Sequence, residues 1–195
     1  MVNVFTGAEK GFLGSNLKKE INGWNVDYGD ILVDNFYLPS KIDNVFHFAG
    51  PSDDFDFADE AKTIQTIING TINVLNLAKK NNSKFIFAST LGVETPTENI
   101  YCISKFLIEE YIKNNYDNWI ILRIPRVYDR TRNKGLMKKL RLDLVPQKDM
   151  TNQIEFLTLF DFIEQTLEVV NERNIVYNYK DLHCDTIANI KKLYT

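Results

Sequence analysis

Short apolar segments alternate with longer segments of helical periodicity along this chain. The short segments are rich in Val, Ile and Phe without polar alternation, which is typical of strands buried on both faces. The longer segments repeat Ile, Leu and Val every three or four residues, which predicts helices with one apolar face. Strands that alternate with helices predict a parallel, doubly wound α/β sheet. The expected strands are 2–5, 44–50, 84–90 and 119–123, with another inside 25–30, and the expected helices are 15–21, 59–80 and 101–115.

Small or hydroxyl-bearing residues lie where several of these strands end. Ala49 is at the end of the third strand, and Ser89 and Thr90 end the fourth. Ile124 follows the fifth strand. Ligands of doubly wound sheets bind beyond the carboxyl ends of the strands. We therefore expect these residues to surround one ligand site, together with the glycines that follow the first strand.

A glycine-rich loop, from Thr6 to Gly14, joins the first strand to the first helix. Glycines there permit a tight turn and close approach of the backbone to a ligand. The N-terminus of the helix then offers free N–H groups and the positive end of its dipole to phosphates. The loop predicts binding of a dinucleotide pyrophosphate, and the alternative is a glycine-rich turn without a ligand. The residues expected to hold the dinucleotide here are Gly7, Gly11, Phe12, Leu13 and Gly14, with Phe48, Ala49 and Gly50 at the third strand and Ile124 and Val127 at the fifth.

Two acidic residues follow the expected second strand. In dinucleotide-binding sheets an acid near this point accepts hydrogen bonds from the adenosine ribose. Asp27 and Asp30 are both candidates, and either can instead be a turn residue.

Tyr101 and Lys105 are four residues apart in a segment that favours a helix, so their side chains share one face. A lysine beside a tyrosine favours the phenolate and is expected to lower the pKa of the phenol, which makes it a usable proton donor and acceptor. The same spacing recurs at Tyr37 and Lys41, but Pro39 between them argues against a helix. The alternative for Tyr101 is a half-buried aromatic residue with Lys105 as a solvated neighbour.

Composition narrows the classes of partner. The net charge of -3 gives no support for binding to nucleic acid or to a membrane surface. No apolar stretch is long enough to span a bilayer, no secretory signal opens the chain, and the two cysteines lack metal-ligand spacing. We therefore expect a cytoplasmic protein without a metal site. A basic run from Lys134 to Arg141 is either a solvated helix face or a phosphate-binding patch. His47 is expected to be a structural residue at the end of its strand.

Taken together, the motifs resemble those of the extended short-chain dehydrogenase/reductases, the NAD-dependent epimerase/dehydratase family that acts on nucleotide sugars. The resemblance covers nearly the whole chain through short matches in the right order. The matching segments are the nucleotide loop 6–14, the His-x-Ala-Ala-like strand end 45–50, the Gly-Thr-x-Asn-Val-Leu helix 70–75, the hydroxyl pair 89–90, the Tyr-x-x-x-Lys motif 101–105, the Leu-Arg-x-x-Asn-Val-Tyr-Gly-like segment 122–128 and the late segment 155–162.

The resemblance implies a Rossmann-like fold and roles for four residues. Tyr101 would exchange a proton with a sugar hydroxyl while nicotinamide exchanges a hydride at the same carbon. Lys105 would hold the ribose hydroxyls and keep Tyr101 acidic, and Thr90, or Ser89 in its place, would hydrogen-bond the reacting oxygen. The implied substrate is a nucleotide-linked sugar, changed by an epimerase or a ketoreductase.

Three departures from the family pattern matter. The loop has one residue more between Gly7 and Gly11 than is usual in this branch. In that detail it resembles the single-domain branch, where a basic residue at the position of Lys10 meets the 2′-phosphate of NADP. The acidic stretch after the second strand instead suits NAD, so both cofactors stay open. Leu91 follows Thr90 where the dehydratases have an acid, which argues against 4,6-dehydration.

The third departure is that the chain is much shorter than members of the family that it resembles. We expect residues 1–130 to form the NAD(P)-binding Rossmann domain, and 131–195 to be a reduced substrate-binding region packed on the same core as a small C-terminal appendage. A homodimer is expected through helices 59–80 and 101–115, which relatives use as an interface, because the second helix carries more apolar residues than one buried face needs. Two alternatives are a cofactor-binding module without turnover and an NADPH-dependent reductase of a small ketone.

Overall fold

The computed structural model describes residues 1–195 apart from 27–28, 34–37, 52–57 and 97–98. Its main sheet has six strands in the order β2-β1-β3-β4-β5-β8. Every pairing between neighbouring strands of this sheet is parallel, so the predicted Rossmann-like, doubly wound fold class is confirmed. The strands are β1 (Asn3–Thr6), β2 (Trp24–Val26), β3 (Asn44–His47), β4 (Lys84–Thr90), β5 (Trp119–Ile124) and β8 (Ile175–Asn178).

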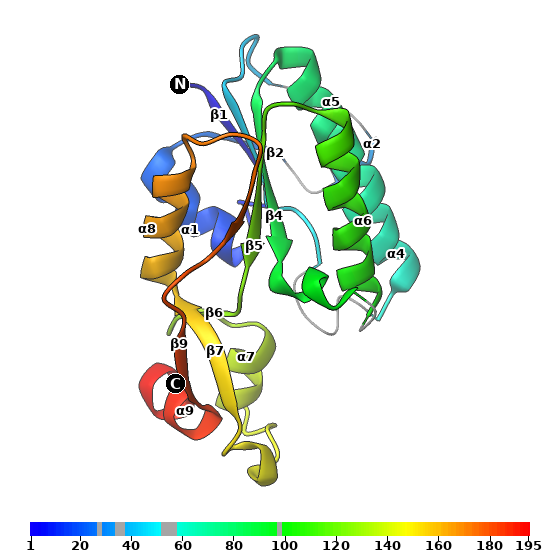
Figure 1. The fold of residues 1–195 in the computed structure, drawn as a ribbon. Helices are drawn as coiled ribbons and strands as arrows, with labels where there is room; N and C mark the ends of the chain where they lie inside the picture. Colours follow the sequence, from blue (N-terminus) through cyan, green and yellow to red (C-terminus); the bar gives the residue numbers. More distant parts are fainter. Residues whose placement is uncertain (27–28, 34–37, 52–57, 97–98) are drawn as a thin grey trace.

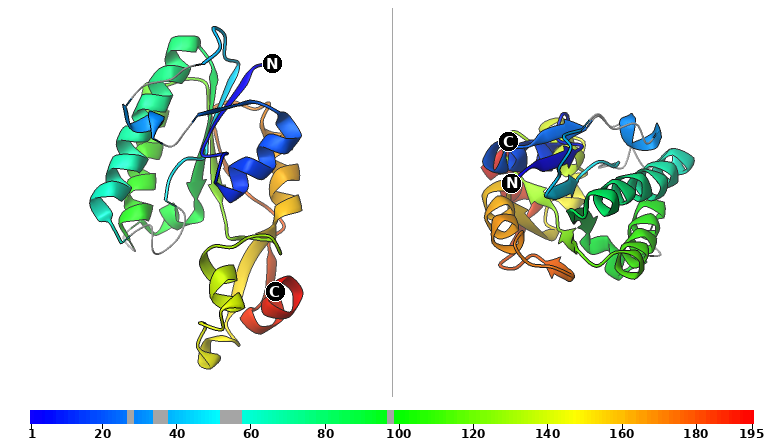
Figure 2. Two further views of the ribbon diagram at one scale, coloured as in Figure 1. Left: turned by 180° about the vertical axis from the view of Figure 1, so that it is seen from behind. Right: turned by 90° about the horizontal axis from the view of Figure 1, so that it is seen from above.

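Helices cover both faces of the sheet. On one face lie α1 (Phe12–Ile21) and α8 (Leu159–Val169), and on the other α4 (Glu60–Ile64), α5 (Thr71–Asn81) and α6 (Ile100–Asn115) (Figures 1 and 2). A short helix, α2 (Asp30–Val33), follows β2. The helix expected over 59–80 is interrupted, because a π-helical segment, η1 (Gln65–Gly70), lies between α4 and α5. Such π-turns are often found at functional sites.

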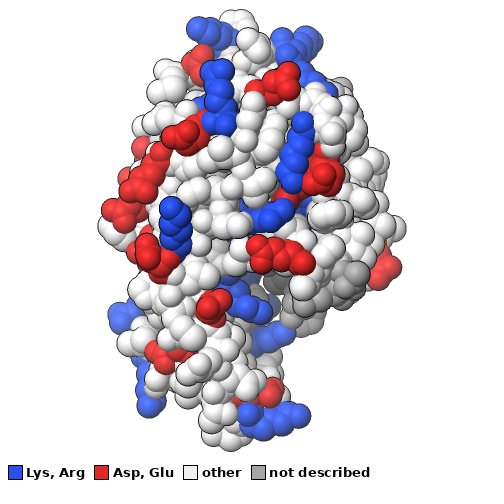
Figure 3. All heavy atoms as spheres, viewed as in Figure 1, with Lys and Arg blue, Asp and Glu red and all other residues white. Residues whose placement is uncertain are grey.

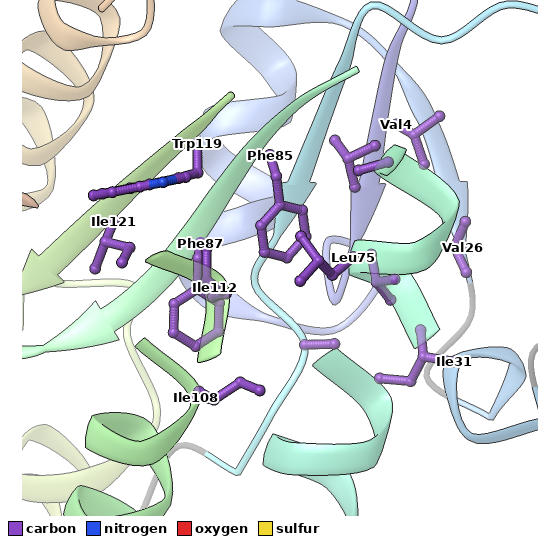
Figure 4. Packing of buried hydrophobic residues seen from close by; sticks show 14 of the residues in the cluster. Val4, Val26, Ile31, Leu75, Phe85, Phe87, Ile108, Ile112, Trp119 and Ile121 are labelled. Carbon is purple, nitrogen blue, oxygen red and sulfur yellow. The ribbon is translucent and has the colours of Figure 1, made fainter. Parts of the chain in front are cut away.

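The strands are apolar on both faces because each face packs under helices. Phe85 and Phe87 of β4 face α5 and α6, and lie in one cluster with Leu75 and Ile112 (Figure 4). Ile86, between them, points to the opposite face and joins the cluster under α1 and α8. The period of two along a strand thus explains why the strands read as continuous apolar runs.

The C-terminal appendage is a second, smaller sheet with its own core. It contains β6 (Val127–Tyr128), β7 (Gln153–Thr158) and β9 (His183–Thr186), with α7 (Gly135–Arg141), the short turn η4 (Gln147–Asp149) and α9 (Ile187–Tyr194). Tyr128, Met137, Phe156 and Ile190 are buried in its core. The appendage lies beyond the carboxyl ends of the main strands (Figure 1). Residues 131–195 therefore belong to two parts of the fold. The strand β8 is in the main sheet and α8 packs against it, whereas the remaining elements form the appendage.

The strand order reverses between β1 and β3, which are neighbours in the sheet. From β1 the chain goes to β2 on one side, and from β3 to β4 on the other. A ligand of a doubly wound sheet binds at this switch point. Within the described part of the chain, no helix is long and apolar enough to cross a membrane.

Candidate active site

A cleft of about 1170 Å³ opens at the carboxyl ends of the main strands, next to the appendage. It brings together most of the residues that the sequence singled out, from five separate segments. The predicted residues that line it are Gly7, Lys10, Gly11, Phe12, Leu13, Gly14, Phe48, Ala49, Gly50, Ser89, Thr90, Tyr101, Lys105 and Ile124.

Three predicted cofactor residues are not placed at this cleft. Val127 is buried in the core beneath α1 and α8, because it points inward at the start of β6. Asp30 begins α2, and its neighbour Gly29 lines the cleft whereas Asp30 does not. Asp27 lies outside the described residues, as does Tyr37 of the second Tyr-x-x-x-Lys copy.

The loop after β1 is closed by glycines that allow close backbone contacts. Gly7 has a φ of +74°, and a Cβ added to it would lie 2.6 Å from the Ala49 nitrogen. The Gly11 N–H donates to the Gly7 carbonyl over 3.1 Å. The N-cap residue of α1 is Gly11, which has no side chain to cap the helix that begins at Phe12. A tight loop that leads into an uncapped helix N-terminus fits the pyrophosphate of a dinucleotide.

His47 is a structural residue below the floor of the cleft. Its ring is fully buried, with hydrogen bonds of 2.6 Å to the Thr6 hydroxyl and 2.9 Å to the Thr71 hydroxyl. Burial, with a smaller effect of the Lys105 charge, lowers the pKa of His47 to about 3. A neutral, doubly bonded imidazole ties β1, β3 and α5 together, so His47 has no free nitrogen for proton transfer.

Tyr101 and Lys105 lie one turn apart near the start of α6. Asn99 caps this helix, since its side chain accepts a 2.9 Å hydrogen bond from the Cys102 N–H. Lys105 is 4% exposed, and its Nζ donates to the Ala88 carbonyl over 2.6 Å. The same Nζ lies 5.8 Å from the centre of the Tyr101 ring. The helix therefore brings the phenol and the ammonium to the same wall of the cleft.

The expected acidification of Tyr101 is wrong for this state of the protein. Burial raises the pKa of Tyr101, Cys102 adds to this rise and Arg132 opposes it. Burial also lowers the pKa of Lys105 to about 7, while the Glu109 charge acts in the opposite direction. Desolvation penalises the charged form of both groups, and it is the largest cause of each shift.

The two hydroxyls at the end of β4 differ in their surroundings. The Ser89 hydroxyl donates to the buried carboxylate of Glu109. The Thr90 hydroxyl accepts a 3.3 Å hydrogen bond from the Gly92 N–H, in the turn η2 (Leu91–Glu94). Ser89 is thus committed to a contact inside the protein, and Thr90 is the better candidate for a contact with a ligand.

Several basic residues at the cleft were not assigned to it from the sequence. Arg126, Arg132 and Lys134 line its side next to the appendage. Arg132 lies over the Phe12 ring at 5.3 Å and donates to the Val127 carbonyl over 2.8 Å. Figure 3 shows Lys and Arg side chains around the hollow where the main body meets the appendage. The basic run that begins at Lys134 gave a partial signal, since a phosphate-binding patch was one of its two interpretations.

The chain belongs to the NAD dependent epimerase/dehydratase family, whose model matches residues 6–172. The predicted family is thereby confirmed, and with it an enzyme class that depends on NAD(P). Comparison with curated protein sequences gives no match.

Solved structures of low sequence identity share the fold. A UDP-galactose 4-epimerase has a TM-score of 0.78 and 18% identity, and the match covers 98% of this chain and 81% of that one. The Thermus thermophilus UDP-glucose 4-epimerase in complex with NAD has a TM-score of 0.76 and 17% identity, with the same two coverages of 98% and 81%. The Bacillus anthracis dTDP-4-dehydrorhamnose reductase in complex with NADP has a TM-score of 0.80 and 18% identity, covering 98% of this chain and 79% of that one.

Proposed function

We propose that this protein is an NAD(P)-dependent enzyme that acts on a nucleotide-linked sugar, as an epimerase or a ketoreductase. The observation that carries the proposal is the shared cleft, which is lined by the 6–14 loop, Tyr101, Lys105 and Thr90. Family membership supports NAD(P) chemistry. The names of the structural neighbours, which include two nucleotide-sugar epimerases and a nucleotide-sugar reductase, support the substrate class.

In this proposal each residue of the site has one task. Tyr101 passes a proton to or from the reacting oxygen of the sugar, and Thr90 hydrogen-bonds the same oxygen. Lys105 donates to the ribose hydroxyls of the cofactor, which when bound supplies hydride exchange at the reacting carbon. Because burial raises the pKa of Tyr101, the phenol keeps its proton at neutral pH. A protonated phenol can donate to a carbonyl oxygen, so this state of the site suits the reductive direction.

The phosphates of the cofactor and of the substrate need separate partners. We assign the cofactor pyrophosphate to the N-terminus of α1 and its loop, and either NAD or NADP fits this arrangement. Lys10 also lines the cleft, and in this proposal it meets the adenosine 2′-phosphate when the cofactor is NADP. Arg126, Arg132 and Lys134, on the appendage side, suit the phosphates of the sugar nucleotide. The appendage therefore acts as the reduced substrate-binding region.

A panel assay tests the proposal. The protein is incubated with NAD(H) or NADP(H) and each of a set of UDP-, GDP-, ADP- and dTDP-linked sugars, and the products are separated by chromatography and mass spectrometry. Conversion of one nucleotide sugar to its epimer, or of one keto-sugar to its alcohol, supports the proposal.

Two other outcomes contradict it. Turnover of small ketones by NADPH without turnover of any sugar nucleotide favours a carbonyl reductase. Cofactor binding without turnover of either class favours a cofactor-binding module. Identification of a nucleotide that copurifies with the protein narrows the panel.

A further inference from the structure

Two consecutive residues of β4 hold two consecutive turns of α6. The Ala88 carbonyl accepts from Lys105 Nζ over 2.6 Å, and the Ser89 hydroxyl donates to the Glu109 carboxylate. Lys105 and Glu109 are four residues apart, so they lie on the same face of α6 as Tyr101. These contacts fix the position of α6 along its axis and its rotation about that axis, relative to the end of β4.

Arg123 completes the arrangement from β5. It is paired in register with Ser89, so its side chain reaches the same carboxylate. Arg123 Nη2 lies 2.8 Å from Glu109 Oε2, and Nε lies 3.2 Å from the same oxygen. The Glu109 side chain is fully buried, whereas Lys113, 3.8 Å from the same oxygen, is partly exposed. A buried carboxylate with a two-point guanidinium partner is a rigid element.

Only part of this network lies at the cleft. Lys105 and Tyr101 line the cleft, whereas Glu109 and Arg123 do not. We propose that Glu109, held by Ser89 and Arg123, is the positioning residue of the site: it fixes Lys105 against the end of β4 and sets the share of Lys105 that is protonated. Arg123 neutralises part of the Glu109 charge and so limits its effect on Lys105.

The charges around Lys105 support this assignment. Glu109 is the carboxylate that raises the pKa of Lys105 against desolvation, which holds the value at about 7. From β3, the buried His47 is neutral. Tyr101, which is on the same helix as Lys105, is neutral as well, because burial raises the pKa of its phenol. The Phe87 ring lies 4.4 Å from Lys105 Nζ and carries no net charge. Arg123, from β5, is bound to the Glu109 carboxylate.

A direct titration of Lys105 tests the proposal without any substrate. Lysine labelled with ¹³C at Cε is incorporated into the full chain, and its resonances are followed by NMR from about pH 5 to 10. The Lys105 signal is the one that Lys105→Arg removes. In Glu109→Gln the midpoint should fall by roughly one pH unit or more, because a nearby carboxylate is lost. In Glu109→Asp, which keeps the charge, the midpoint should stay closer to the wild-type value.

Two further variants separate charge from packing. Glu110→Gln removes a carboxylate from the neighbouring, half-exposed position of α6 and should leave the midpoint unchanged. Arg123→Lys keeps the charge but loses the two-point contact, so it should lower thermal stability and move the midpoint much less than Glu109→Gln. An unchanged midpoint in Glu109→Gln overturns the proposal. If that variant does not fold, a midpoint that moves further in Glu110→Gln than in Glu109→Asp overturns the proposal instead.

The link from this network to catalysis rests on the proposed function. Once a substrate is known, the pH profile of kcat should move in Glu109→Gln in the same direction as the NMR midpoint. A midpoint that moves while no sugar nucleotide is converted by the wild type leaves the network in place and contradicts the proposed function alone. A shifted midpoint with an unshifted pH profile in an active enzyme rejects the catalytic part of the inference.

Discussion

At the scale of single residues, burial decides the protonation of the site. Tyr101 keeps its proton and Lys105 holds its proton weakly, because each lies in surroundings that disfavour its charged form. Near neutral pH Lys105 can gain or lose a proton, whereas Tyr101 is held as the neutral phenol. This differs from the picture of a lysine that acidifies a tyrosine by charge alone.

Tyr101→Phe should lower the rate of hydride transfer by roughly 10²- to 10⁴-fold while cofactor affinity stays near the wild-type value, because only the phenolic oxygen is lost. Single-turnover kinetics at saturating cofactor measure this rate. Lys105→Met should reduce both rate and cofactor affinity. Tyr111→Phe is the matched control, since Tyr111 lies in the same helix but packs against the core. An equal loss in Tyr101→Phe and Tyr111→Phe contradicts the assigned role.

Lys10→Glu should weaken NADP(H) more than NAD(H), because a repulsive charge replaces an attractive one at the 2′-phosphate. Isothermal titration with both cofactors gives the ratio of the two affinities. Glu9→Gln, in the same loop and also at the cleft, is the control for general changes of the loop. An unchanged ratio in Lys10→Glu leaves Lys10 without a role in cofactor choice.

His47 should make the protein less stable in acid. Its pKa in the folded protein is about 3 against an ordinary value of 6.5, so between these values the unfolded chain binds the proton and the folded chain does not. Stability should fall as the pH decreases from 6.5 towards 3, by a total on the order of 5 kcal/mol. Urea unfolding at a series of pH values measures the slope. His47→Gln cannot titrate, and its curve should lack this part of the slope.

At the scale of elements, the loop from β1 into α1 depends on close backbone contacts. A Cβ at Gly11 would lie 2.1 Å from the Gly7 carbonyl oxygen, so even Gly11→Ala must displace the loop. The displaced loop should lose the rise in melting temperature that NAD(H) or NADP(H) gives the wild type. Differential scanning fluorimetry with and without cofactor measures this, with Glu9→Ala as a loop control that keeps the rise. A full rise in Gly11→Ala rejects the loop as the pyrophosphate site.

The elements that sequence could predict are those whose pattern is local. Phe85, Ile86 and Phe87 form an apolar run that is possible only where helices cover both faces, so the strand and its burial could be predicted together. The π-turn before Thr71 could not be predicted, because an extra residue in a helical turn leaves the apolar spacing almost unchanged. The small sheet of the appendage was also missed, because β6 and β7 are paired across a long stretch of chain.

In the candidate site, too, the sequence could predict the local signals but not the contacts that depend on packing. Glycines after a strand and a tyrosine one turn before a lysine are local signals, and the structure places them at one cleft. Glu109 and Arg123 each look like a surface charge in the sequence. Only the packing of α6 on β5 shows that Glu109 is fully buried and bound to the partly exposed Arg123. Burial likewise reversed the expected effect on Tyr101, because desolvation depends on neighbours from several elements.

At the scale of the whole molecule, α6 has two apolar faces. Ile108 and Ile112 pack against the main sheet. Ile103, Phe106 and Leu107 are 37%, 38% and 55% exposed on the other side of the helix. Ile64 of the neighbouring α4 is 42% exposed. A second copy of the chain that packs α4 and α6 against the same pair would cover this surface, as an isologous interface requires.

We therefore predict a homodimer through α4 and α6, with a dimer mass in multi-angle light scattering at micromolar concentration. Leu107→Glu should convert it to a monomer with an unchanged circular dichroism spectrum, because a charge in the centre of an apolar interface would be desolvated without a partner. Leu144→Glu changes a residue that is 63% exposed on the appendage and should remain a dimer. A monomeric wild type, or a dimer that Leu107→Glu leaves intact, contradicts this interface.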